Sequence, residues 1–186
     1  MDREILRVGL EAHPCEDSLE SAHRARMLEL LSSEGDPFSR HHFEPGHFTA
    51  SAFVLSPDGM HLLLIYHAKL KLWLQPGGHV DAADENIVAA ACREAEEETG
   101  IRDYDLDSDV PGFLDLDIHG IPPNPKKGEP AHEHFDVRVL LRTRSEVIHA
   151  GSDALDAKWV PIADVEGIAT DESVMRAVRK LRTRGR

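Results

Sequence analysis

The chain has 186 residues, which is enough for one domain with a hydrophobic core and a terminal extension. Its 41% hydrophobic residues suit a globular protein, and its net charge of −13 disfavours non-specific binding to nucleic acid or to an anionic membrane. Because no apolar run is long enough to cross a bilayer and no secretory signal follows Met1, we expect a cytoplasmic protein without a membrane span.

Hydrophobic periodicity predicts two helices and two strands in the first hundred residues. The predicted helices span residues 17–33 and about 84–99, and the predicted strands span residues 47–55 and 61–67. The two strands flank the turn Ser56-Pro57-Asp58-Gly59, so we expect them to form a hairpin. The apolar face of the first helix is expected to consist of Leu19, Ala22, Met27, Leu30 and Leu31. This helix is interpreted as a packing element or as the contact of a homodimer.

The second half of the sequence predicts further strands and a terminal helix. The strands are expected at 113–118, 135–142 and 158–161, the helix at 173–182, and a proline-rich loop at 121–130. The basic tail at 176–186 is expected to be solvated. Strands interleaved with helices indicate an α/β sandwich on a mixed sheet at residues 41–186, preceded by a helical extension at residues 1–40.

Three glutamates share one sector of the helix expected at 84–99. Glu94 and Glu98 lie one turn apart, and Glu97 lies beside them. Like charges at this spacing repel, and a divalent cation would reverse the sign of their interaction. Oxygen ligands of this kind suit Mg²⁺ or Mn²⁺ better than zinc. The alternative is a solvated acidic helix end.

A pair of glycines precedes this helix in the segment Gln75-Pro76-Gly77-Gly78. Glycine allows the backbone to approach a ligand closely and to adopt conformations that other residues avoid. A backbone carbonyl of this loop could therefore complete a metal site that the helix begins.

Together these residues resemble the Nudix box, which has a glycine, an acidic residue, Arg-Glu, Glu-Glu and a final glycine at fixed spacing. The second half of the box matches Arg93-Glu94-Ala95-Glu96-Glu97-Glu98-Thr99-Gly100-Ile101. The first half differs, because six residues separate Gly78 from Glu85 where the box has five. Either Asp84 or Glu85 takes the acidic position, and the alternative role for Asp84 is to cap the helix.

The resemblance implies a Nudix-like α/β/α sandwich and a magnesium-dependent hydrolase that cuts a diphosphate linkage in a nucleotide-like small molecule. Candidate substrates are ADP-ribose, nucleotide sugars, dinucleoside polyphosphates and nucleoside triphosphates, and the sequence does not choose among them. One alternative is a 5′ RNA pyrophosphohydrolase, which would need a basic groove. The other is a non-catalytic domain that senses a nucleotide, which would be expected to lack the metal-binding glutamates.

The resemblance also implies roles for single residues. Glu94, Glu97, Glu98 and the backbone carbonyl of Gly77 would be metal ligands. Arg93 would orient a glutamate, and either Glu97 or Glu98 would accept the proton from the attacking water.

Several polar residues outside the glutamates are candidates for substrate contact. They are Gln75, Gly78, His79, His134 and Asp136. His132, His134 and Asp136 alternate along the start of a strand and are expected to share one face, where they would bind substrate, bind metal, supply a base or form a solvated sheet edge. Asp117 and His119 alternate in the same way and are expected nearby. His41, His42 and His47 are expected to be surface or packing residues.

Overall fold

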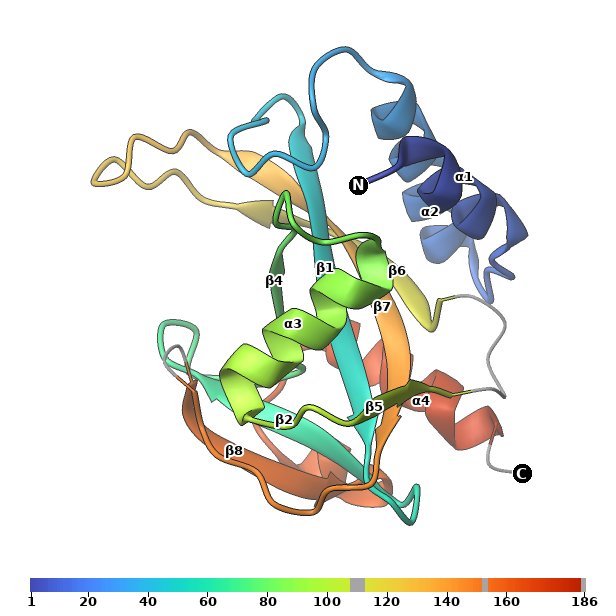
Figure 1. Ribbon diagram of the computed structural model, residues 1–186, viewed down its shortest axis with the longest axis vertical. Coiled ribbons are helices and arrows are strands. Elements are labelled where there is room, and N and C mark those ends of the chain that lie inside the picture. The colour runs from blue at the N-terminus through green and yellow to red at the C-terminus, as the bar shows by residue number, and fades with distance from the viewer. Residues whose placement is uncertain (108–112, 152–153, 185–186) are drawn as a thin grey trace.

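The computed structural model describes residues 1–107, 113–151 and 154–184, and within these ranges it has one eight-stranded mixed sheet with helices on both faces (Figure 1). The strands are β1 (Gly46–Leu55), β2 (His61–His67), β3 (Trp73–Leu74), β4 (Gly77–His79), β5 (Tyr104–Leu106), β6 (Asp115–Ile121), β7 (His132–Thr143) and β8 (Ala154–Pro161). The helices are α1 (Arg3–Ala12), α2 (Ser18–Ser32), α3 (Ile87–Thr99), the 3₁₀ helix η1 (Ile162–Gly167) and α4 (Glu172–Arg184). None of the helices in the described ranges has the length and apolarity that a membrane crossing requires.

The sheet is built around the parallel pair β1 and β7. Its strand order is β3-β2-β1-β7-β5, with β4 on β1, β6 on β7 and β8 on β2. The expected hairpin of β1 and β2 is confirmed, since Leu55 pairs with Leu62 in antiparallel register and Gly59 takes a positive φ of 72° in the turn. Mixed pairing and helices on both faces confirm the α/β/α sandwich.

The two faces of β1 and β7 differ in chemistry because side chains alternate along a strand. One face is apolar, and its Phe48, Ala50, Phe135 and Val137 lie in one buried core together with residues of α2 and α3. The other face bears His47, Thr49, Ser51, His132, His134, Asp136 and Arg138, and we call it the polar face. Farther along the same side, α4 covers Phe53 and Leu140. The alternation expected for His132, His134 and Asp136 is thus confirmed.

The N-terminal helices pack on the rest of the chain. Leu6 and Leu10 of α1 and Met27 of α2 are buried in the same core as the sheet. The predicted apolar face was partly wrong, because Leu19 and Ala22 are exposed. The buried positions are instead taken by Glu20 and His23, together with Met27, Leu30 and Leu31. Since the apolar side of α2 is covered within this chain, it gives no support to a homodimer, which stays a prediction.

The sequence predicts that the basic tail is solvated, and this prediction was wrong for two of its residues. Arg176 and Lys180 of α4 are buried, and both bond to the carboxylate of Asp115 on β6. Lys180 also lies 2.5 Å from a carboxylate oxygen of Glu20, which ties α2 to α4. Burial of these charges is offset by paired opposite charges. Residues 185–186 of the tail lie outside the described residues.

Element boundaries differ from the expectation mainly at strand ends. Each of β6, β7 and β8 reaches beyond the predicted segment, and the expected loop at 121–130 joins β6 to β7. Helix α1, the short strands β3, β4 and β5, and the 3₁₀ helix η1 are not among the elements predicted from the sequence. The predicted boundary between an extension and a domain at residue 40 stays a prediction.

Candidate active site

Helix α3 begins later than the sequence predicted, at Ile87 instead of about residue 84. Asn86 is the N-cap, and its side-chain oxygen accepts hydrogen bonds of 3.0 Å from the backbone N–H groups of Val88 and Ala89. Asp84 is therefore not the cap. Gly100 ends the helix with a φ of 75°, a left-handed conformation that glycine adopts without steric cost.

The glycine pair lies directly against the glutamates of α3. The backbone N–H of Gly77 donates to Glu98 Oε2 at 3.0 Å. A methyl group placed on Gly78 would lie 2.5 Å from Glu94 Oε2, so the close approach of β4 to the Glu94 carboxylate requires glycine at this position. Glu94 and Glu98 thus both face β4, as their spacing of one helical turn predicts.

Arg93 connects the acidic groups of the site. Its guanidinium donates to both oxygens of Asp84, at 3.0 and 2.9 Å, and to Glu94 Oε1 at 2.9 Å. It also donates to Glu97 Oε1 at 3.3 Å and to the backbone carbonyl of His79 at 2.8 Å. One planar cation thereby fixes the positions of three carboxylates and of β4.

The contacts of Arg93 decide between the two acidic residues that the sequence left open. Asp84 is 7% exposed and pairs with Arg93, whereas Glu85 is exposed. Five residues separate Gly78 from Asp84, which is the gap that the resemblance requires. The additional residue of this chain therefore lies between Asp84 and Arg93.

The carboxylates of the site differ in their electrostatic state. Burial raises the pKa of Glu94 above its ordinary value, and the hydrogen bond from Arg93 only partly offsets this. Burial acts in the same direction on Asp84, but the hydrogen bonds from Arg93 and from the Asp81 backbone outweigh it, so the pKa of Asp84 is lowered. The positive charge of Arg93 thus compensates the carboxylate of Asp84 more fully than it compensates that of Glu94. The carboxylate oxygens of Glu94, which lie near β4, therefore suit an additional cation.

Comparison with known proteins identifies the family of this chain. The family model described as NUDIX domain matches residues 45–180. This chain belongs to the Nudix family. A curated relative of Lactococcus lactis subsp. cremoris, named a probable DHNTP pyrophosphohydrolase, is 35% identical over 98 residues, which cover 53% of this chain and 55% of the relative. The chain thus spans about half the length of the curated relative that it matches.

Solved Nudix structures share the fold. An Ap4A hydrolase of C. elegans, solved as a binary complex, aligns with a TM-score of 0.57 and 20% identity over 73% of this chain and 95% of that chain. The NUDIX domain of Shewanella oneidensis NrtR, solved with ADP ribose, aligns with a TM-score of 0.55 and 20% identity over 75% of this chain and 88% of that chain. At these identities the likeness concerns the fold.

The other predicted substrate residues lie on the polar face, beside the Nudix box. Gln75 Nε2 donates to Ser51 Oγ at 3.4 Å, and the ring centroids of His79 and His134 lie 5.1 Å apart. Asp136 is 2% exposed, and its carboxylate accepts hydrogen bonds from Thr49, Ser51 and Arg138. It therefore holds neighbouring side chains in place, and contact of these residues with substrate stays a prediction.

His47, expected to be a surface or packing residue, is buried and packs against the other histidines of this neighbourhood. His47 is 1% exposed and its ring centroid lies 4.9 Å from that of His134 and 5.1 Å from those of His79 and His132. Burial is the main cause that lowers the pKa of His79 to about 4 and the pKa of His134 to about 2. These rings are therefore neutral near pH 7. No local pattern marks His47, because the parallel pairing of β1 with β7 creates the contact.

Proposed function

We propose that this Nudix protein hydrolyses a diphosphate linkage in a nucleotide-like small molecule and uses Mg²⁺, or alternatively Mn²⁺. The observation that carries the proposal is the position of Glu94 and Glu98 against Gly77 and Gly78, with Arg93 fixing the acidic groups around them. A non-catalytic sensor would not need this full set of carboxylates.

The residues present suit a magnesium ion. Glu94, Glu97, Glu98 and the carbonyl of Gly77 supply only oxygen ligands, which Mg²⁺ and Mn²⁺ prefer. The raised pKa of Glu94 reflects a buried carboxylate that protein groups compensate only in part. When bound, magnesium would neutralise the diphosphate and make its phosphorus open to attack.

The side chains of the box have separate tasks in this proposal. Arg93 is a positioning residue, because it holds Asp84 and Glu94 by direct hydrogen bonds. The Gly77 N–H holds one oxygen of Glu98, which fixes the direction of the other. The side chain of Glu97 is 58% exposed and is therefore open to water. Either Glu97 or Glu98 can accept the proton of the attacking water.

The first substrate to test is DHNTP, because the curated relative at 35% identity carries that name. The match covers about half of that relative, so the panel also needs ADP-ribose, nucleotide sugars, dinucleoside polyphosphates and nucleoside triphosphates. A 5′-triphosphorylated RNA tests the alternative of an RNA pyrophosphohydrolase. The net charge of −13 argues against that substrate.

The experiment measures product release from this panel by chromatography, with Mg²⁺, with Mn²⁺ and with a chelator. The proposal expects turnover of at least one small molecule and its loss in the chelator. Folded protein that binds magnesium and a nucleotide but turns over no member of the panel would overturn the proposal in favour of a sensor. Turnover that is unchanged in the chelator would contradict the role of the metal.

A further inference from the structure

The polar face gathers five histidines that the Nudix box does not use as metal ligands. They come from four strands and are His47 of β1, His79 of β4, His119 of β6, and His132 and His134 of β7. The register places His134 between His47 on one side and His119 on the other. Segments that are far apart in the sequence thus bring imidazoles together at one end of the sheet.

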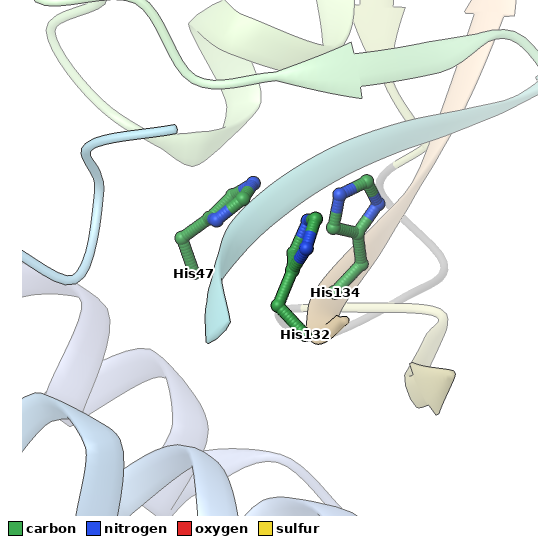
Figure 2. A group of neighbouring side chains, drawn as sticks. All are labelled: His47, His132 and His134. Atoms are coloured by element: carbon green, nitrogen blue, oxygen red, sulfur yellow. The ribbon is translucent and has the colours of Figure 1, made fainter. Parts of the chain in front are cut away.

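Three of these rings lie close enough together to share a metal ion after small movements. His47, His132 and His134 each offer a ring nitrogen, and these nitrogens all lie within 4.8 Å of one another. Figure 2 shows the three side chains extending in one direction from the ends of β1 and β7. Nitrogens around a tetrahedral zinc, at Zn–N distances of about 2.0–2.1 Å, lie roughly 3.3 Å apart, so small ring movements would bring them to a common ion.

Hydrogen bonds at Nδ1 of His47 and His132 leave Nε2 of each ring available to a metal ion. His47 Nδ1 lies 3.1 Å from the carbonyl of His42, and His132 Nδ1 lies 2.8 Å from the carbonyl of Pro130. A carbonyl only accepts, so both Nδ1 atoms carry the proton and both Nε2 atoms present a lone pair. Histidines that bind metals usually donate the other ring N–H in this way.

The buried Nε2 of His47 is the group that most needs a ligand. It has no hydrogen-bond partner among the described residues, although His47 is only 1% exposed. A buried polar atom without a partner costs free energy, and a metal ion would satisfy it. A second group of potential ligands, His13, Cys15 and Glu20, also contains a buried nitrogen without a partner in the described part of the chain, His13 Nδ1. Its Glu20 carboxylate, however, is already bonded to Lys180 and to His13 Nε2.

We propose that His47, His132 and His134 bind a transition metal ion of the zinc class, at a site separate from the magnesium site of the Nudix box. Imidazole ligands select zinc, copper, nickel or iron over magnesium. The ring of His79 lies 5.1 Å by centroids from those of both His47 and His134, where it can provide a fourth ligand. The ion would join the ends of β1 and β7 beside β4, and its binding does not depend on the proposed hydrolysis.

The experiment measures zinc bound to metal-free full-length protein by dialysis and elemental analysis in the presence of excess Mg²⁺. The ligand variants are His132→Gln and His134→Gln. His41→Gln is the matched control, because His41 is exposed and lies outside the group. Glu98→Gln is the control for the Nudix box. Cobalt absorption spectra of the wild-type protein report the coordination geometry, and melting curves with and without zinc report its effect on stability.

The proposal expects one zinc ion per chain in the wild type, in His41→Gln and in Glu98→Gln, with a higher melting temperature in zinc. It expects the affinity for zinc to fall at least about a hundredfold in the two ligand variants. Wild-type cobalt spectra of a tetrahedral nitrogen site would support it even if a ligand variant failed to fold. Absence of bound zinc in the wild type, an octahedral cobalt spectrum, or loss of zinc only in Glu98→Gln would overturn it.

Discussion

Replacing Gly78 with alanine should displace the Glu94 carboxylate while it leaves the fold intact. The added methyl group would lie 2.5 Å from Glu94 Oε2, whereas ordinary contact begins at 3.4 Å, so the carboxylate has to retreat by about 0.9 Å. It can do so because it is the end of a flexible side chain. A displacement of about 1 Å in a catalytic site costs on the order of a hundredfold in rate, or about 2.7 kcal/mol.

The assay for this variant compares kcat/KM in magnesium with the free energy of unfolding in urea. Gly120→Ala is the matched control, because nothing lies within 4 Å of a methyl group at that position. We expect kcat/KM to fall about a hundredfold only in Gly78→Ala, and the unfolding free energy of both variants to change by less than about 1 kcal/mol. Wild-type kcat/KM in Gly78→Ala would show that catalysis does not depend on the position of the Glu94 carboxylate.

Three further variants, Arg93→Lys, Arg138→Met and Glu20→Gln, test individual ion pairs. Arg93→Lys cannot reproduce the paired hydrogen bonds to Asp84, so magnesium affinity should fall about 10- to 100-fold by titration calorimetry, and an unchanged affinity would contradict this. Arg138 is a buried cation that pairs with both Asp115 and Asp136. Arg138→Met removes this cation, so the unfolding free energy of the variant, measured in urea, should be about 3–5 kcal/mol below that of the wild type. Burial opposes ionisation of Glu20, but hydrogen bonds lower its pKa from 4.5 to about 2, so wild-type stability should fall by up to about 3 kcal/mol as pH drops from 4.5 to 2. The unfolding free energy of Glu20→Gln, measured by urea titration at several pH values, should lack this part of the pH dependence. A fall with pH identical to that of the wild type would contradict the prediction.

The arrangement of the glutamates could be predicted because they lie within one helix. The period of an α-helix fixes Glu94 and Glu98 one turn apart wherever the helix begins. The acidic partner of Arg93 could not be chosen from spacing alone, since a shift of one residue in an irregular loop exchanges Asp84 for Glu85. The contacts of the Arg93 guanidinium make that choice.

The histidines and the buried ion pairs were harder to predict because distant segments create them. His47 meets His134 through the parallel register of β1 and β7. Arg176 and Lys180 look like parts of a solvated basic helix until Asp115 is placed beside them. In both cases the local sequence is compatible with a surface position, and tertiary packing decides.

In the proposed function, the carboxylates facing β4 support metal-dependent hydrolysis. The most direct test is the rate of product release by Glu98→Gln compared with Glu96→Gln, in magnesium and after chelation. Glu96 lies on the same helix and pairs with Arg102 at the surface, so it controls for loss of charge. We expect turnover to fall at least about a hundredfold in Glu98→Gln and to stay at the wild-type rate in Glu96→Gln. Equal turnover by the two variants would contradict it.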